Sequence, residues 1–310
     1  MNTMGTNIQS GIDYAAISRK NRSWDIIFAS LGIIVLFIAI TTLLALFLDL
    51  AIRGAPQWTD PDFYTSFPSR KPLEAGILSA WVGTIMVMLV TAVVAVPLGV
   101  GAGLYMEEYA TKNWFTDIIE INVSNLAGVP SIVYGLLALG LFVQTFGMGE
   151  TVLVAGLVLA LMILPIVIVS TRESIRSIPS ELREAAYGLG ANQWQTMSLY
   201  ILPAAKPGII TGAIVGLSRA IGETAPIITI GALSYIAFLP PSPVGGDFPF
   251  ISFEWLNSGF TVMPIQMFGW VSRPQADFQI TAAAAGAVLI VMTLAMNGLA
   301  IYIRYRARKS

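Results

Sequence analysis

Six stretches of this chain are mostly apolar over the length that a helix needs to cross a lipid bilayer, which is about 20 residues. They cover residues 25–48, 76–104, 121–146, 151–170, 207–233 and 280–303. Charged residues make up only 11% of the chain, whereas a soluble domain carries roughly 25%. The sequence therefore predicts an all-α, polytopic membrane protein with six transmembrane helices.

Two of these stretches contain residues that break helices. Pro97 is expected to interrupt the second, and Gly128, Pro130 and Gly135 are expected to make the early part of the third irregular. Such breaks are tolerated in a membrane where neighbouring helices bury the freed backbone groups.

The chain divides at the start of the first apolar stretch. Residues 1–24 are polar and lack the apolar core and cleavage site of a signal peptide. We expect a short N-terminal segment, 1–24, and one transmembrane domain, 25–310. The connections at about 50–75 and 234–279 are rich in Pro, Gly and aromatic residues, which predicts ordered caps rather than further domains.

The distribution of Lys and Arg predicts the orientation. An even number of spans places both termini on one side, and positive charge is enriched on the cytoplasmic side. With both termini cytoplasmic, the inside segments hold Arg19, Lys20, Arg22, Lys112, Arg172, Arg176, Arg183, Lys206, Arg304, Arg306, Arg308 and Lys309. The outside segments then hold Arg53, Arg70, Lys71 and Arg273. The chain is therefore expected in the inner membrane of the cell. Both termini and the loop 171–206 are expected in the cytoplasm.

Several kinds of chemistry are excluded by composition. The chain has no Cys and no His, so it has no disulfide, no thiolate or imidazole metal site and no Ser–His relay. It also lacks a phosphate-loop lysine motif and a dinucleotide-binding glycine motif. The glycines at 99–103 are not followed by Lys–Ser/Thr and predict close helix packing instead. We expect no catalytic residue, metal or cofactor in this chain.

The loop 171–206 contains signals for a first short helix. It starts near Pro179, where a missing N–H has no cost, and Glu181 and Glu184 lie in its N-terminal half, where the helix dipole favours them. Gly188 and Gly190 end the helix, with Gly190 suited to the left-handed cap position.

A second short helix follows in the same loop. Asn192 can cap it together with Gln195, which lies three residues later as in a capping box. Pro203 and Pro207 are expected to stop it and to begin the next span. Small residues on the first helix, Ala185 among them, would allow another backbone to approach closely. The alternatives are a docking surface and an amphipathic helix that lies on the membrane.

Two charges lie inside the fifth apolar stretch. Arg219 is about 16 Å along the axis from Gly208 at 1.5 Å per residue, near mid-membrane, and Glu223 follows at i+4 on the same face. Each charge costs about 2.5–3.5 kcal/mol at that depth. Pro226 cannot donate to the carbonyl four residues before it, and Thr224 adds a hydroxyl. Arg219, Glu223 and Thr224 therefore form a polar group inside an apolar span, called the polar station below.

The station has more than one interpretation. The pair is either a structural ion pair or part of a substrate path, and the planar fork of Arg219 suits an oxyanion. Glu223 either orients Arg219 or holds it closed until a path opens. Three other acids, Asp117, Glu120 and Glu150, lie at loop edges and are expected to be solvated.

The loop resembles a known signature. Glu184-Ala185-Ala186, Gly190 and then Leu202-Pro203 resemble the EAA signature of ABC-importer permeases, with Tyr200 where that family usually has Ile. The resemblance implies a type I (MetI-like) permease fold with cytoplasmic coupling helices. In that family the signature seats in a groove of the ATPase subunit.

Further motifs resemble the permeases of phosphate-specific ABC importers. They are 219–226, which contains Arg219, Glu223 and Thr224, and the segments 127–135 and 262–266. The last span, 278–304, is more similar to the A-type subunit than to its C-type paralogue. The resemblance implies alternating access by a complex with a C-type permease, an ATPase dimer that binds ATP and Mg, and an extracytoplasmic phosphate-binding protein.

The expected partners are these subunits and membrane lipid, with no nucleic acid. The expected function is ATP-driven phosphate import. The alternatives are import of another oxyanion, such as molybdate, sulfate or phosphonate, and an ion-driven carrier or channel that needs no docking helix. A membrane enzyme is disfavoured because the chain lacks His, Cys and paired acids at mid-depth.

Overall fold

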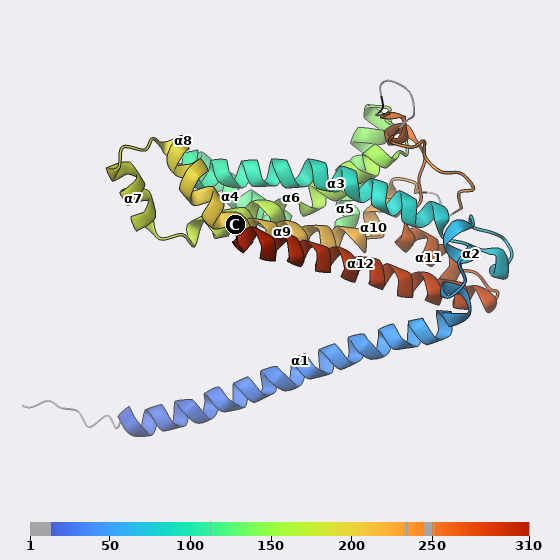
Figure 1. Cartoon of the computed structure of the whole chain (residues 1–310), viewed down its shortest axis with the longest axis horizontal. Helices are drawn as coiled ribbons and strands as arrows, with labels where there is room; N and C mark the ends of the chain where they lie inside the picture. Colours follow the sequence, from blue (N-terminus) through green and yellow to red (C-terminus); the bar gives the residue numbers. More distant parts are fainter. Residues whose placement is uncertain (1–13, 112, 233–234, 245–249, 251, 310) are drawn as a thin grey trace, which may run out of the picture. The chain divides into compact units, whose positions relative to one another are not determined.

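A computed structural model describes residues 14–111, 113–232, 235–244, 250 and 252–309 (Figure 1). Every regular element that it describes is a helix. The chain forms two units, residues 1–49 and 50–310. The compact unit begins at residue 50.

The first unit lies largely within α1 (Tyr14–Trp58). Residues Trp24–Trp58 are long and apolar enough to cross a membrane, and none of the most apolar part is buried. The side chains of Phe28, Ile33 and Phe37 are each at least 65% exposed. Such a surface is stable against lipid but not against water.

The second unit is built around α6 (Val152–Arg176). Two thirds of its most apolar segment is buried, the largest share among the five single-helix candidate spans in the described residues. It packs against α3 (Leu78–Leu104) and α9 (Leu202–Ile221), and α12 (Asp277–Lys309) packs against α9 (Figure 1). Among the described residues, five helices could span a membrane, or six if one bent pair counts as a span.

Small residues let these helices approach closely. A Cβ atom at Gly99 would lie 2.7 Å from the side chain of Val167, and one at Gly103 would lie 2.7 Å from Thr171. The residues 99–103 therefore pack α3 against α6, as expected from small-residue interfaces in membranes.

The third apolar stretch is broken. It forms α4 (Trp114–Leu126) and α5 (Ser131–Ala138), continued by the π-helical η3 (Leu139–Thr145), and the two parts are bent by 105°. The break falls at Gly128 and Pro130, where irregularity was expected. The hydroxyl of Tyr134 donates to the carbonyl of Leu126 at 2.8 Å, so one backbone acceptor at the break is satisfied.

Prolines interrupt the other helices less than expected. Pro97 lies inside α3, which continues through Leu104 into the π-helical η2 (Tyr105–Tyr109). The helix α8 (Gln193–Thr196), η4 (Met197–Ile201) and α9 form one stretch. Pro203 lies in the first turn of α9, where Pro is tolerated, and Pro207 lies inside α9.

The fifth span therefore has different bounds from those expected. Its helical stretch runs from Gln193 to Ile221 rather than over 207–233, because Gly222 and Pro226 end α9. A short helix, α10 (Ala225–Thr229), follows the break.

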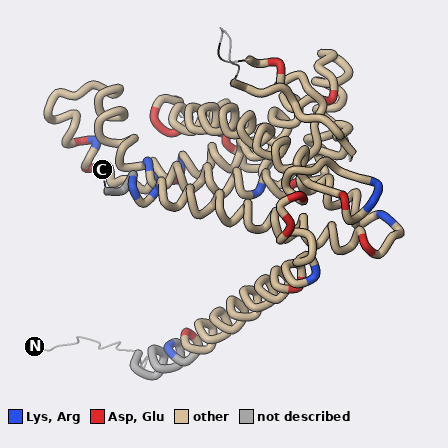
Figure 2. The backbone as a smooth tube through the Cα atoms, turned by 45° about the vertical axis from the view of Figure 1, so that its right-hand side comes forward, with Lys and Arg blue, Asp and Glu red and all other residues tan. Residues whose placement is uncertain are grey.

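The described residues of the connections 50–75 and 234–279 form short helices in the two caps. They contain α2 (Asp62–Thr65), η1 (Pro72–Glu74), η5 (Glu254–Asn257) and α11 (Met263–Val271). Phe63, Trp270 and Phe278 form a small apolar core with them. Helix α7 (Ser180–Gly188) lies at the opposite end of this unit, beside α8 (Figure 1). Figure 2 shows charged residues gathered toward both ends of the unit, with few between.

Candidate functional site

Helix α7 has the predicted ends. Pro179 occupies its N-cap position. At the other end Gly190 has φ +87°, the amide of Ala191 donates to Ala186 O at 3.0 Å, and the amide of Gly190 donates to Tyr187 O at 2.9 Å. This is the Schellman arrangement, so the left-handed cap at Gly190 is confirmed.

The capping box that starts α8 is also confirmed. The amide of Gln195 donates to Asn192 Oδ1, and the amide of Asn192 donates to Gln195 Oε1, both at 2.9 Å. The expectation of a separate second helix is wrong, because α8 runs through η4 into α9.

The signature residues divide between an exposed and a buried set. Glu184 and Ala185 are exposed and Ala186 is buried. Leu202 is half-buried and Pro203 is exposed in the first turn of α9. Two large apolar side chains near them are also open, with Leu189 84% and Trp194 68% exposed. An open apolar surface beside a polar helix is typical of a docking site.

An ion pair that the sequence did not predict anchors α7. Arg183 Nη2 lies 2.7 Å from Glu108 Oε1, and Arg183 Nε donates to the same oxygen at 2.9 Å. Arg183 also donates to Ile178 O at 3.1 Å and to Ile175 O at 3.2 Å. The partners lie about 75 positions apart in sequence, so no local pattern pointed to the pair.

A second group of charges lies next to it. Glu107 accepts from Arg172 at 3.3 Å and from Arg176 at 3.0 Å. Arg172 is buried and also pairs with Glu120 at 2.8 Å. The expectation that Glu120 is merely solvated is therefore wrong. The i,i+4 spacing of Arg172 and Arg176 was the available signal, because it presents two cations on one helix face.

The three residues of the predicted polar station lie at the end of α9. Arg219 is in its last turn, and Arg219 Nε lies 3.4 Å from Glu223 Oε1. The side chains are 39% and 20% exposed, respectively. The expected helical i,i+4 face is not kept, because the helix has ended at Ile221, but the two side chains still meet. Thr224 follows at the N-cap of α10.

The short helices after the two breaks pack together. A Cβ atom at Gly135 of α5 would overlap Thr229 Oγ1 and would lie 2.7 Å from Pro226 Cα in α10. Only a glycine allows so close an approach. The segment 127–135 and the segment 219–226 therefore meet, and Tyr134 lies within electrostatic reach of Arg219.

Two cavities border the station. One of about 10 Å³ is lined by Glu223 together with Thr84, Val87 and Met88 of α3. This is close to the smallest volume that holds a water. The other, of about 490 Å³, is an apolar groove lined by Gly222 and Thr224 with residues of α11.

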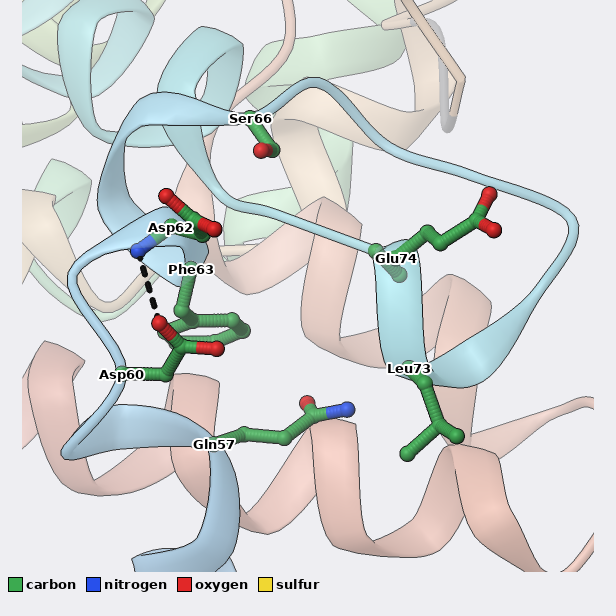
Figure 3. Close-up of a pocket in the computed structure, with 8 residues that line it drawn as sticks. Gln57, Asp60, Asp62, Phe63, Ser66, Leu73 and Glu74 are labelled. Carbon is green, nitrogen blue, oxygen red and sulfur yellow. Dashed lines mark hydrogen bonds between the residues drawn. The ribbon is translucent and has the colours of Figure 1, made fainter.

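A further cavity of about 190 Å³ lies in the cap between α1 and α3 (Figure 3). Asp60, Asp62 and Glu74 line it, and the amide of Asp62 donates to Asp60 Oδ1 at 3.0 Å. Gln57 donates to Pro72 O at 2.7 Å. Within the part of the chain that the structure describes, no group of three or more acids is arranged to hold a metal ion.

The chain is similar to curated permeases along most of its length. It is 31% identical over 267 residues to the probable ABC transporter permease protein YqgI of Bacillus subtilis, covering 82% of this chain and 86% of the relative. It is also 31% identical over 275 residues to the phosphate transport system permease protein PstA of Mycobacterium leprae, covering 88% and 86%.

Solved structures share the fold at lower identity. A chain of a bacterial alginate ABC transporter matches with a TM-score of 0.64 at 15% identity, covering 94% of this chain and 98% of that one. A chain of the MetNI methionine ABC transporter matches with a TM-score of 0.56 at 14% identity, covering 73% and 93%. These likenesses confirm the expected MetI-like permease fold.

A protein-family model matches most of the chain. Residues 95–309 match the model described as binding-protein-dependent transport system inner membrane component. Members are multi-pass, non-catalytic permeases without a cofactor, and they work with a partner permease, a binding protein and separate ATPase subunits that bind the ATP. The chain belongs to this family of ABC-importer permeases.

Proposed function

We propose that the chain is an A-type permease subunit of an ATP-driven importer of inorganic phosphate. It forms half of the translocation path, with both termini and α7 in the cytoplasm. The observation that carries the proposal is the Arg219–Glu223 pair where α9 ends. Relatives named PstA, at about 30% identity, support phosphate as the substrate.

The chemistry of Arg219 suits an oxyanion. Its planar guanidinium can donate two parallel hydrogen bonds to phosphate, which an ammonium group cannot do. With 39% of its side chain exposed, Arg219 is accessible from outside the chain. The segment that follows Arg219 packs against α5 through Pro226 and Thr229, so Arg219 lies near the point where two broken helices meet. Broken helices are typical of substrate sites in transporters.

Glu223 fits the role of a gate. A carboxylate beside a path for a dianion repels the substrate unless it is neutralised, and here Arg219 neutralises it. The cavity at Glu223 is too small for phosphate. The pair therefore represents a closed arrangement, and opening requires Arg219 to exchange Glu223 for the substrate.

The ATPase would dock on the exposed part of α7. Glu184 and Ala185 supply a small polar surface, and Leu189 and Trp194 supply apolar area. Ala186 is the buried residue of the helix and Gly190 caps its end, while Leu202 and Pro203 begin α9. The other subunits of the complex would be a C-type permease, a PstB-type ATPase dimer and a PstS-type phosphate-binding protein.

The test is phosphate uptake by the whole complex in proteoliposomes with Arg219→Ala. We expect uptake to be lost while the ATPase and the second permease still co-purify with the chain. Arg219→Lys keeps the charge but not the fork, so its uptake should remain well below that of the wild type. Normal uptake by Arg219→Ala would remove Arg219 from the substrate path.

A further inference from the structure

The segment η2, which continues α3, contacts the end of α6, helix α7 and the start of α8. In η2, the carboxylate of Glu107 binds the last turns of α6 through Arg172 and Arg176. The carboxylate of Glu108 binds α7 through Arg183. The carbonyl of Glu108 accepts from Gln193 Nε2, at the start of α8, at 2.7 Å. Five residues of π-helix therefore join α3 to the end of α6, to α7 and to α8.

The polar contact provides much of the attachment of α7. Of the residues of α7, all of which are described, Ala186 alone is buried. Arg183 connects the elements of this region, because its guanidinium binds Glu108, the carbonyl of Ile175 at the C-terminal end of α6 and the carbonyl of Ile178 in the connection that follows α6. The pair is shielded from solvent, with side chains 21% exposed for Arg183 and 12% for Glu108.

The other end of α3 reaches the polar station. Leu78–Tyr109 forms one helical stretch, and its residues Thr84, Val87 and Met88 line the cavity beside Glu223. From Met88 to Glu108 the helix covers about 30 Å at 1.5 Å per residue. Gly99 and Gly103 hold this length close to α6. A continuous helix in close contact with its neighbour can pass a displacement from one end to the other.

We propose that Glu108 is a positioning residue that transmits the movement of α7 to the Arg219–Glu223 station through α3. Glu108 and Arg183 make α3 follow α7, and α3 then shifts the wall of the Glu223 cavity. Glu107 braces the same segment against α6. The π-helical form of η2 fits this role, because such segments are frequent at functional sites. The inference rests on the proposed docking of the ATPase on α7.

The experiment uses Glu108→Gln in the whole complex, reconstituted with the second permease, the ATPase and the loaded binding protein. ATP hydrolysis and phosphate import are measured in the same vesicles. The matched control is Glu173→Gln. The side chain of Glu173 is 64% exposed, and its ion pair with Arg176 is long, at 3.4 Å.

We expect Glu108→Gln to keep the ATPase bound and hydrolysing ATP, because the exposed face of α7 is unchanged. Phosphate imported per ATP hydrolysed should fall about fivefold or more, the lower range of coupling between linked sites. Glu173→Gln should keep the wild-type ratio. A purely structural role for Glu108 would lower hydrolysis and import together.

An unchanged ratio in Glu108→Gln would overturn the inference, and so would loss of the ATPase from the complex, which would make Glu108 part of docking. If Glu108→Gln does not assemble, Arg183→Lys replaces it, because it keeps the charge but cannot bind Glu108 and both carbonyls together; the same ratio decides. A wild-type complex that hydrolyses ATP without importing phosphate would instead contradict the proposed function.

Discussion

Gly135→Ala tests whether the two broken helices meet at the station. The new Cβ would overlap Thr229 Oγ1 and would lie 2.7 Å from Pro226 Cα and 2.8 Å from Pro226 O. Non-bonded carbon atoms prefer at least about 3.5 Å. The backbone of α10 would therefore have to move by roughly 0.8 Å, because a backbone atom cannot rotate away as a flexible side chain does.

The expected free-energy cost follows from a matched control. Gly140→Ala lies in the same span, and no described atom beyond the adjacent backbone of its own helix lies within 4 Å of a Cβ there. Both variants gain about 0.5–1 kcal/mol from the helix preference of Ala over Gly, and this contribution cancels in their difference. What remains is overpacking, about 1–3 kcal/mol, which should make Gly135→Ala the less stable protein.

The assay is a denaturant titration of both variants in mixed micelles, combined with phosphate uptake by the complex. Uptake should fall in Gly135→Ala, because α10 carries the residues that follow Glu223. Equal free energies of unfolding for Gly135→Ala and Gly140→Ala would refute the close contact between α5 and α10.

Two further predictions concern the α7 region. Glu184→Lys should release the ATPase or separate hydrolysis from import, because a cation replaces an exposed anion on the docking face; unchanged co-purification and uptake would argue against docking there. Asn192→Ala should destabilise the start of α8 by about 0.5–2 kcal/mol through loss of the capping box, measured by hydrogen exchange at Gln195, whereas unchanged exchange would show that the cap contributes nothing.

Local chemistry was predictable from the sequence. The cap at Gly190 and the box of Asn192 and Gln195 involve residues within a few positions, so their spacing alone identified them. The pairing of Arg219 with Glu223 was predictable for the same reason. The bend between α4 and α5 was foreseen only as irregularity, because glycine and proline mark a break without giving its angle.

Contacts distant in sequence were not predictable. Glu108 and Arg183 meet because α3 and α6 pack along their lengths, which depends on glycines fitting against Val167 and Thr171. The helix breaks expected at Pro97 and Pro207 were wrong for a related reason. Both residues stay helical because tertiary packing offsets the lost hydrogen bond. A rule that considers only neighbouring residues does not include that packing.

The most direct measurement is uptake of labelled phosphate by the reconstituted complex, with and without ATP, in the presence of excess sulfate or molybdate. We expect phosphate accumulation that requires ATP and the ATPase, persists in the presence of either competing anion and disappears in Arg219→Ala. Accumulation of sulfate or molybdate in place of phosphate, or phosphate uptake that continues without the ATPase, would contradict it.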